Sequence, residues 1–198
     1  MAGRKTGWYR RSRQRWPAVP TVSGAPTGHE WARELLARDD WVVLDTETTG
    51  LDAGAEVIDL AVLDRNGTAL VETLLRPRRA IPAGVTRIHG LTNDHVREAP
   101  AFPDIWPRLQ EILAGRTIVA YNVAFDARLL RQTAAHHGLA LTWRDEACAM
   151  RQYAAYQRTR PCSLETACLR HGIPAGGHRA AADCRATLAL LYVMATDA

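Results

Sequence analysis

Apolar residues in this chain fall into short runs separated by polar or turn-forming residues. The run Trp-Val-Val-Leu opens residues 41–48 and is typical of a buried strand. Arg65, Asn66 and Gly67 form a hairpin-turn signal between two further runs, which predicts an antiparallel meander of three strands. A short apolar run at 117–121 predicts a fourth strand, and a weaker pattern follows it. We therefore expect strands at 41–48, 56–64, 69–75, 117–121 and 141–146.

Helical spacing dominates the rest of the chain. Thr27 and Glu30 form the T-x-x-E pattern of a capping box, which predicts a helix that extends to about Arg38. Residues 92–113 are expected to be helical in pieces, because three prolines interrupt the pattern. Further helices are expected at 125–137, 147–158, 163–171 and 179–194.

The order of these elements indicates the fold class. Three consecutive strands followed by alternating strands and helices predict an α/β domain, in which helices cover a mixed five-stranded sheet. In such a sheet we expect a cleft near the ends of the first and fourth strands. The domain should occupy residues 29–198, since residues 17–28 are rich in Pro, Gly, Ser and Thr and are typical of a linker.

Charge is distributed unevenly along the 198 residues. Residues 1–16 hold six basic and no acidic residues, so the remaining chain has nineteen basic and twenty-one acidic residues. The segment 1–28 is therefore expected to be a basic N-terminal arm. It could hold polyanions, with aromatic residues available to stack on bases, or it could be a solvated tail without a partner. The aromatic residues of this arm are Trp8, Tyr9 and Trp16.

The chain has no apolar stretch of the ~20 residues that span a bilayer, so no membrane association is expected. No apolar segment of a secretory signal follows the basic start, and we expect a cytoplasmic protein. An organelle transit peptide is the alternative, because the start is rich in arginine. Four cysteines are interpreted as small buried thiols in a reducing compartment. Cys168 and His171 have C-x-x-H spacing, but no second pair with zinc-like spacing accompanies them.

Asp45 and Glu47 form the first group of candidate functional residues. They follow an apolar strand run, and residues two apart on a strand point to one face. Two neighbouring carboxylates at the end of a buried strand repel each other unless a cation compensates, which favours a divalent metal. The alternative is a strand end in water, where both carboxylates are solvated.

Two more acidic positions lie further along the chain. Asp126 follows the fourth strand and Asn122, but an aspartate at a helix start is equally expected as a cap. Asp183 falls at the edge of an apolar helical stripe, and His178 precedes it after two glycines. A buried pair with an arginine is the alternative for Asp183, and a surface position is the alternative for His178. The apolar stripe comprises Thr187, Leu190, Leu191 and Met194.

Taken in order, these motifs resemble those of the DnaQ-like (DEDDh) exonucleases, which include the epsilon subunit of bacterial DNA polymerase III. The family motifs are D-x-E, N-x-x-x-D and H-x-x-x-x-D, and the segment 88–92 (Ile-His-Gly-Leu-Thr) is also similar to the family. The resemblance covers about residues 40–195 and implies an RNase H-like fold. Tyr121 stands where many relatives have histidine. The chain continues for only fifteen residues after Asp183, which argues against a replicative proofreading role.

The resemblance also implies a mechanism. Two Mg²⁺ or Mn²⁺ ions would be held by the carboxylates, with Asp45 between them, Glu47 and Asp183 on the first and Asp126 supporting the second. His178 would act as general base. The implied activity is that of a 3′→5′ exonuclease, which releases nucleoside 5′-monophosphates.

The expected partner is single-stranded or 3′-ended nucleic acid, with DNA favoured. An exoribonuclease or oligoribonuclease that acts on RNA is the alternative. A non-catalytic nucleic-acid-binding scaffold is more remote, because the DEDDh set is complete. Substrate contacts are expected from six residues, although Leu51 and Phe125 could equally belong to the core. The six are Thr48, Gly50, Leu51, His89, Asn122 and Phe125.

Overall fold

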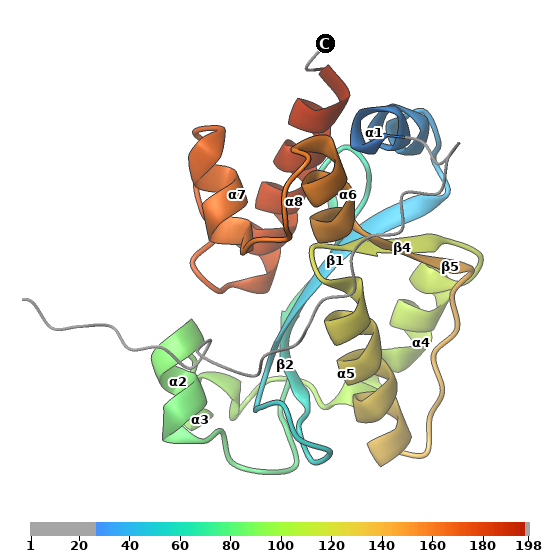
Figure 1. Cartoon of the computed structure of the whole chain (residues 1–198). Helices are drawn as coiled ribbons and strands as arrows, with labels where there is room; N and C mark the ends of the chain where they lie inside the picture. The colour runs from blue at the N-terminus through green and yellow to red at the C-terminus, as the bar shows by residue number, and fades with distance from the viewer. Residues whose placement is uncertain (1–26, 197–198) are drawn as a thin grey trace, which may run out of the picture.

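The computed structural model describes residues 27–196, whose five strands form one sheet in the order β3-β2-β1-β4-β5 (Figure 1). β1 pairs antiparallel with β2, and β2 pairs antiparallel with β3. The pairs β1–β4 and β4–β5 are parallel. The mixed five-stranded sheet is therefore confirmed. Its strands are β1 (Trp41–Thr48), β2 (Val57–Leu63), β3 (Ala69–Leu74), β4 (Thr117–Ala120) and β5 (Asp145–Cys148).

Eight helices are present among the described residues. They are α1 (Gly28–Leu36), α2 (Ala83–His89), α3 (Asn93–Val96), α4 (Phe102–Leu113), α5 (Val123–His136), α6 (Ala149–Tyr156), α7 (Leu164–Arg170) and α8 (Ala180–Thr196). The helices expected from the apolar spacing are all found, with ends that differ by a few residues. α2 was not predicted, although Pro82 precedes it and Gly90 follows it, which are typical helix-boundary residues.

The fifth strand was predicted too early in the chain. It was expected at 141–146, whereas β5 begins at Asp145 and ends at Cys148. Its backbone pairs with β4 from Thr117 to Ala120, so the ladder with β4 determines where it lies. The sequence of this edge strand, Asp-Glu-Ala-Cys, has little intrinsic strand preference.

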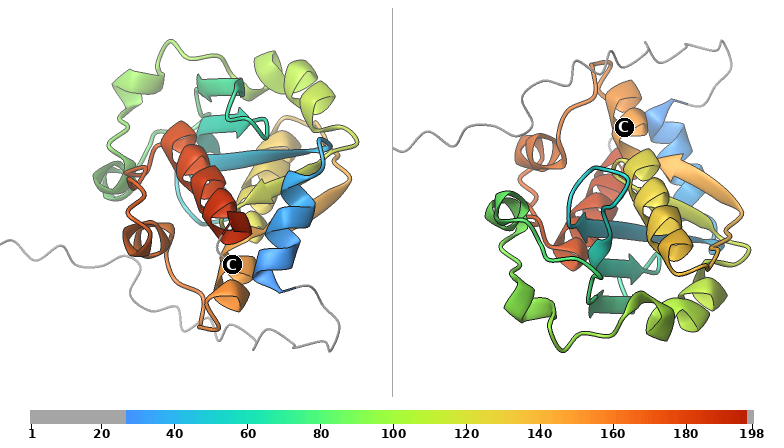
Figure 2. Two further views of the ribbon diagram at one scale, coloured as in Figure 1. Left: turned by 90° about the horizontal axis from the view of Figure 1, so that it is seen from above. Right: turned by 90° about the horizontal axis from the view of Figure 1, so that it is seen from below.

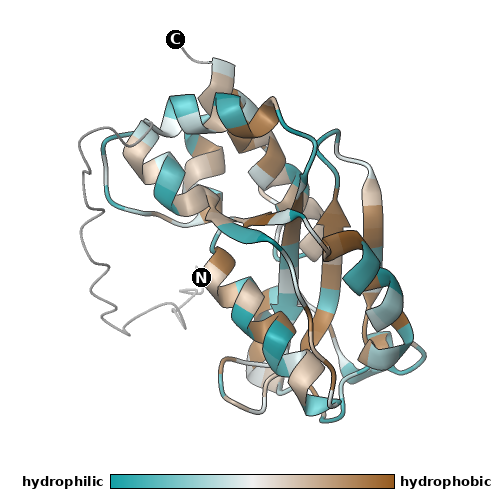
Figure 3. Cartoon of the chain, turned by 90° about the vertical axis from the view of Figure 1, so that its right-hand side faces the viewer, coloured by the Kyte–Doolittle hydropathy of each residue, from teal (hydrophilic) through white to brown (hydrophobic). Residues whose placement is uncertain are grey.

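Helices cover both faces of the sheet. On one face α1, α6 and α8 pack against Trp41 and Val43, and on the other α4 and α5 pack against Val42 and Leu44. Figure 2 shows α8 across one face of the strands and α5 across the other. Apolar residues are concentrated on the strands between these layers (Figure 3). The alternation along β1 therefore assigns each successive residue to a different helical layer.

The predicted capping box is present at the start of α1. The Thr27 hydroxyl accepts a hydrogen bond from the Glu30 N–H, and the Glu30 carboxylate accepts one from the Thr27 N–H. α1 lies beside α8 (Figure 1), where the imidazole of His29 contacts the Met194 carbonyl at 2.8 Å. The basic arm and the linker expected in residues 1–28 lie outside the described residues, except for Thr27 and Gly28, which already belong to this capped helix.

All four cysteines are free thiols. The expected burial is found for Cys168 and Cys184, whereas Cys148 and Cys162 are only half-buried. Among residues 27–196, no helix is both long and apolar enough to cross a membrane.

Candidate functional site

Asp45 and Glu47 lie in the second half of β1, on the face that α8 covers. They continue the alternation of Trp41 and Val43, which pack under the same helix layer. In the antiparallel ladder, Asp45 lies opposite Ala61 of β2, and Glu47 lies opposite Asp59. The predicted side-by-side placement of the two carboxylates is therefore present.

Asp126 reaches the same region from α5. Its side chain is buried, at 3% exposure, and its Oδ1 accepts a hydrogen bond of 2.9 Å from the Thr46 hydroxyl. Thr46 stands between Asp45 and Glu47 and points to the opposite face of β1. Asp126 lies in the first turn of α5, where its charge complements the helix start as the cap alternative expected, and its side chain also joins this helix to β1.

The third motif supplies His178 and Asp183 from the beginning of α8. One ligand atom from each of Glu47, His178 and Asp183 lies within 4.8 Å of the other two. His178 is exposed and has a φ of 60°, a left-handed conformation that is uncommon for a residue with a Cβ. Asp183 is half-buried and forms no ion pair with an arginine of residues 27–196, so the arginine alternative is wrong. His178 does lie at the surface, as its alternative expected, but its ring is close to Glu47 and Asp183.

Burial, and for three of them the charge of neighbouring carboxylates, raises the pKa of the four acidic side chains. Burial raises the pKa of Asp45 well above its usual range, and the charges of Asp126, Asp183 and Glu47 raise it further. Burial, with the nearby charges of Asp183 and Asp59, raises the pKa of Glu47 to about 8. Burial also raises the pKa of Asp126 to about 7, although the Thr46 hydrogen bond opposes this. The pKa of Asp183 is raised by burial as well.

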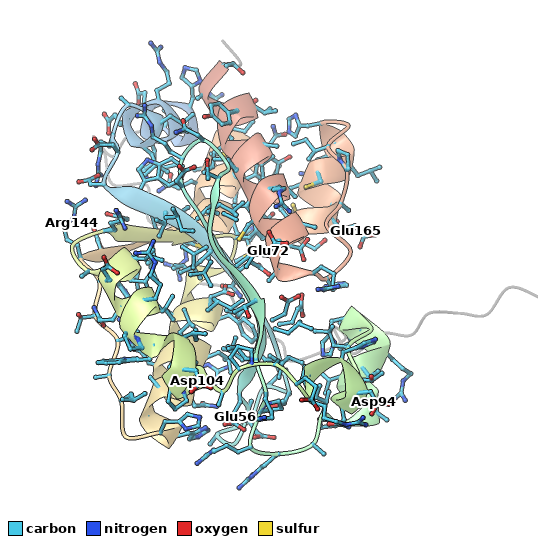
Figure 4. The ribbon with its side chains drawn as sticks, turned by 180° about the vertical axis from the view of Figure 1, so that it is seen from behind. Glu56, Glu72, Asp94, Asp104, Arg144 and Glu165 are labelled. Atoms are coloured by element: carbon cyan, nitrogen blue, oxygen red, sulfur yellow. The ribbon has the colours of Figure 1, made fainter. Side chains whose placement is uncertain are left out.

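Charged groups elsewhere in the described part of the chain are commonly paired, in contrast to this site. Neither Asp45 nor Glu47 forms an ion pair with any arginine of residues 27–196. Figure 4 shows Glu56, Glu72, Asp94 and Arg144, which pair with Arg78, Arg185, Arg97 and Asp40 respectively. Uncompensated carboxylates at close range require protons or a cation.

The donor set fits a hard divalent cation. Asp45, Glu47, Asp126 and Asp183 offer carboxylate oxygens, which are the ligands that Mg²⁺ and Mn²⁺ prefer. The ligand atoms of Glu47 and Asp183 also lie near the His178 ring. Metal ligation is therefore what this arrangement can do chemically, in addition to proton transfer at the imidazole.

The residues after the first motif form the turn that ends β1. The Thr48 hydroxyl donates to the Gly50 carbonyl at 2.8 Å, which tightens the turn. Leu51 is 68% exposed, so the alternative that it belongs to the core is wrong. Asn122 is half-buried and stands at the start of α5. Phe125 is half-buried and packs against the second core cluster, and the Arg128 guanidinium lies 5.6 Å from its ring centre.

His89 is buried at the end of α2. Its Nδ1 accepts a hydrogen bond of 3.0 Å from the Leu91 N–H, so its Nε2 carries the proton. The Nε2 atom is buried without a hydrogen bond of regular geometry, although the Thr48 backbone lies close to the ring. Burial lowers the pKa of His89, which keeps the ring neutral. The ring lines a hollow of about 380 Å³ together with Leu74, His95 and Arg179.

Two residues of the site were missed by sequence reasoning. Thr46 is the middle residue of the D-x-E motif, and Asp59 is the single charged residue in the apolar run Val57–Leu63. A lone aspartate within a strand that is otherwise apolar was a signal, because a buried charge requires a partner.

Most of the chain is similar to known exonucleases. A sequence profile of the RNase T exonuclease family matches residues 42–191. An uncharacterized exonuclease of Escherichia phage 186 is 37% identical over 174 residues, which cover 79% of this chain and 89% of the phage protein. A DNA polymerase III subunit epsilon-like protein of Rhodobacter capsulatus is 37% identical over 108 residues, which cover 51% of this chain and only 15% of that protein.

Solved structures show the same architecture. Exonuclease X in complex with 5′ overhanging duplex DNA matches with a TM-score of 0.60 and 27% identity, over 78% of this chain and 90% of that one. The nuclease domain of 3′hExo, a DEDDh family member bound to rAMP, matches with a TM-score of 0.64 over 80% of this chain and 92% of that one. Its identity is 15%, so it supports the fold alone. Both the profile and the phage relative show that the chain belongs to the RNase T exonuclease family, of the DnaQ-like type that its motifs resemble.

Proposed function

We propose that this protein is a metal-dependent 3′→5′ exonuclease that acts on DNA and releases nucleoside 5′-monophosphates. The observation that carries the proposal is the convergence of four carboxylates from β1, α5 and α8 beside one exposed histidine. Their raised pKa values reflect burial and mutual repulsion, which a cation relieves. The need for a bound cation at these carboxylates favours a catalytic role over that of a scaffold that only binds nucleic acid.

The carboxylates would hold two Mg²⁺ or Mn²⁺ ions. The charges of the other three carboxylates act on Asp45, which would therefore help to hold both ions. Glu47 and Asp183 would hold the first ion, and Asp126 would support the second from the other side of β1. When bound, such ions neutralise charge on the phosphate and on the leaving oxygen and favour ionisation of a water molecule.

His178 would act as general base. Its exposed ring can reach water at the site entrance, and it lies beside the carboxylates of Glu47 and Asp183. An imidazole at this place would accept a proton from the attacking water. Asp183 and His178 would therefore act together, one as ligand and the other as base.

The 3′ end of the strand would enter beside the turn that follows β1. Leu51 is exposed there and would pack against the terminal base, while Thr48 and Gly50 hold the turn and face the terminal sugar. His89 offers a neutral N–H, and Asn122 and Phe125 border the site from α5. DNA is favoured as substrate because Exonuclease X, a relative at 27% identity, is described with overhanging duplex DNA.

Digestion of matched DNA and RNA oligonucleotides by the purified protein tests the proposal. Substrates labelled at the 5′ end should shorten stepwise, only with Mg²⁺ or Mn²⁺, and the product should be 5′-mononucleotides. Asp45→Asn and Asp183→Asn should each lower the rate by orders of magnitude. Asp104→Asn is the matched control, since Asp104 is an exposed residue of α4.

Three results would contradict parts of this proposal. Near-normal digestion by folded Asp45→Asn or Asp183→Asn protein would exclude the assigned site. Faster digestion of RNA than DNA would favour the exoribonuclease alternative. Binding of nucleic acid without hydrolysis under any metal condition would favour a scaffold.

A further inference from the structure

A fifth carboxylate, Asp59, lies next to the proposed metal ligands. It is 4% exposed and stands directly opposite Glu47 in the β1–β2 ladder. Its Oδ2 accepts a hydrogen bond of 2.8 Å from Nε of Arg179 and one of 3.3 Å from the backbone N–H of Ala180. Arg179 directly follows His178, and Ala180 is the first residue of α8.

We propose that the Asp59–Arg179 pair is a positioning clamp that holds His178 and Asp183 in register with Glu47. The inference rests on the proposed exonuclease function and adds residues that its motifs do not contain. Asp59 acts from β2 through Arg179 and Ala180, and it is therefore a positioning residue.

The clamp lies between the two functional groups of the third motif. Arg179 is adjacent to His178, and its carbonyl accepts the Asp183 N–H at 2.9 Å, which is part of the first turn of α8. Holding Arg179 and Ala180 on β2 therefore fixes the start of this helix relative to the sheet. The Asp59 carboxylate accepts a hydrogen bond from the Ala180 N–H, which has no acceptor within the first turn of α8. A capping side chain next to a helix usually plays this part, whereas Asp59 does so from β2.

The local backbone explains why a clamp is needed. Gly177 and His178 both have positive φ angles, of 68° and 60°, and they enter α8 from an irregular segment. A residue with a Cβ in this conformation stays there only when its surroundings hold it. The bonds from Asp59 to the next two residues supply such a constraint.

Simple electrostatics predicts a different pattern, which makes the proposal testable. Burial is the main cause that raises the pKa of Glu47, and the charge of Asp59 adds to it while Arg179 opposes it. If charge alone mattered, loss of Asp59 would weaken cation binding, and loss of Arg179 would strengthen it. A clamp requires both Asp59 and Arg179, so loss of either side chain should weaken cation binding.

The experiment compares Asp59→Asn, Arg179→Gln and the double variant in the full chain. Each single variant should lower kcat by about 10–100-fold, the range typical of residues that orient metal ligands. The double variant should be no more than about 3-fold worse than the more affected single variant, because one interaction is lost in all three. Arg185→Gln is the matched control, since Arg185 of the same helix pairs with Glu72 at 3.1 Å, and its kcat should stay within about 2-fold of wild type.

Thermal unfolding supplies a readout that does not depend on activity. The rise in Tm on adding Mn²⁺ should be smaller in both single variants than in wild type and in Arg185→Gln, because a displaced Asp183 binds the ion less well. Far-UV circular dichroism checks that each variant is folded. Arg179→Lys keeps the charge and should recover part of kcat. If Asp59→Asn does not fold, the half-exposed Arg179 carries the test alone through Arg179→Gln and Arg179→Lys.

Three outcomes would overturn the clamp. In the first, the Mn²⁺-dependent rise in Tm becomes smaller in one single variant and larger in the other. In the second, the losses of kcat in the two single variants add up in the double variant. The third is a raised KM with unchanged kcat in Arg179→Gln, which would make Arg179 a substrate contact. A wild-type protein without metal-dependent digestion would instead contradict the proposed function itself.

Discussion

The hydroxyl of Thr46 donates a hydrogen bond of 2.9 Å to Oδ1 of Asp126, which joins β1 to the first turn of α5. Thr46 is 5% exposed and Asp126 is 3% exposed, so water does not compete for this bond. Because Thr46 separates Asp45 from Glu47 along the strand, the bond fixes the α5 carboxylate relative to both. The residue between two motif positions therefore links the first motif to the second.

Replacing Thr46 by valine should lower activity. Thr46→Val retains the shape and removes the donor, which leaves the Asp126 carboxylate free to turn and less easily ionised, because the Thr46 hydroxyl lowers its pKa. We expect a loss of about 10-fold in kcat, measured at saturating DNA and Mg²⁺. Thr46→Ser keeps the hydroxyl and should remain near the wild-type rate. Equal rates for Thr46→Val and Thr46→Ser would show that the hydrogen bond has no catalytic importance.

The metal-free protein should become less stable as the pH rises. The folded-state pKa values of Glu47 and Asp126 are raised to about 8 and about 7, whereas these side chains titrate near 4 when unfolded. Between about pH 4 and pH 8 the folded protein therefore binds more protons than the unfolded chain, so its free energy of unfolding falls with pH. We expect a lower Tm at pH 8 than at pH 5 in EDTA.

A divalent cation should reverse this pH effect. Mg²⁺ or Mn²⁺ takes the place of the protons and should raise Tm more at pH 8 than at pH 5. Asp126→Asn removes one buried charge, so its Tm in EDTA should depend less on pH than that of wild type. A pH dependence as steep as that of wild type in this variant would show that other groups cause it.

Gly176 should not tolerate a side chain. A Cβ at this position would collide with Oδ1 and the backbone N of Asp183. Gly176→Ala should therefore displace the Asp183 carboxylate and lower kcat by at least about 10-fold. Gly177 is the matched control, because a Cβ there meets no atom within 4 Å and asparagine tolerates its φ of 68°. Gly177→Asn should keep most activity; similar rates for both variants would contradict this account.

His178 should be needed for proton transfer and much less for metal binding. Asparagine is the suitable replacement, because it tolerates the left-handed φ of 60° that alanine disfavours. His178→Asn should lose about 10²–10⁴-fold in kcat, the range of general-base catalysis. Its Mn²⁺-dependent rise in Tm should remain close to that of wild type. Loss of this rise would make His178 a metal ligand, a role that its position beside Glu47 and Asp183 also permits.

Much of the fold follows from local patterns. The apolar run at Trp41 predicts β1, the Asn66-Gly67 turn predicts the hairpin that follows β2, and Thr27 with Glu30 predicts the start of α1. These signals depend on residues close in sequence, so they can be read without the tertiary structure. The position of β5 could not be predicted in this way, because its pairing with β4 overrides its weak strand preference.

The motif residues were identified from the sequence, but their positions in space could be predicted only in part. The spacing of Asp45 and Glu47 determines that both point to one face of β1. Sequence alone left Leu51 and Asp126 with two interpretations each. The fold excludes a core position for Leu51, which lies on an exposed turn. It also directs Asp126 to Thr46, eighty positions away along the chain.

The sequence by itself determined the order of the strands, the identity of the motif carboxylates and the family resemblance, because each depends on residues close together in the chain. Only the tertiary structure decided that Asp59 lies opposite Glu47 and holds Arg179, and that Thr46 holds Asp126. These contacts join β2 to α8 and β1 to α5. They arise because helices packed on both faces of the sheet bring distant residues together, and no periodicity within either segment specifies such a partner.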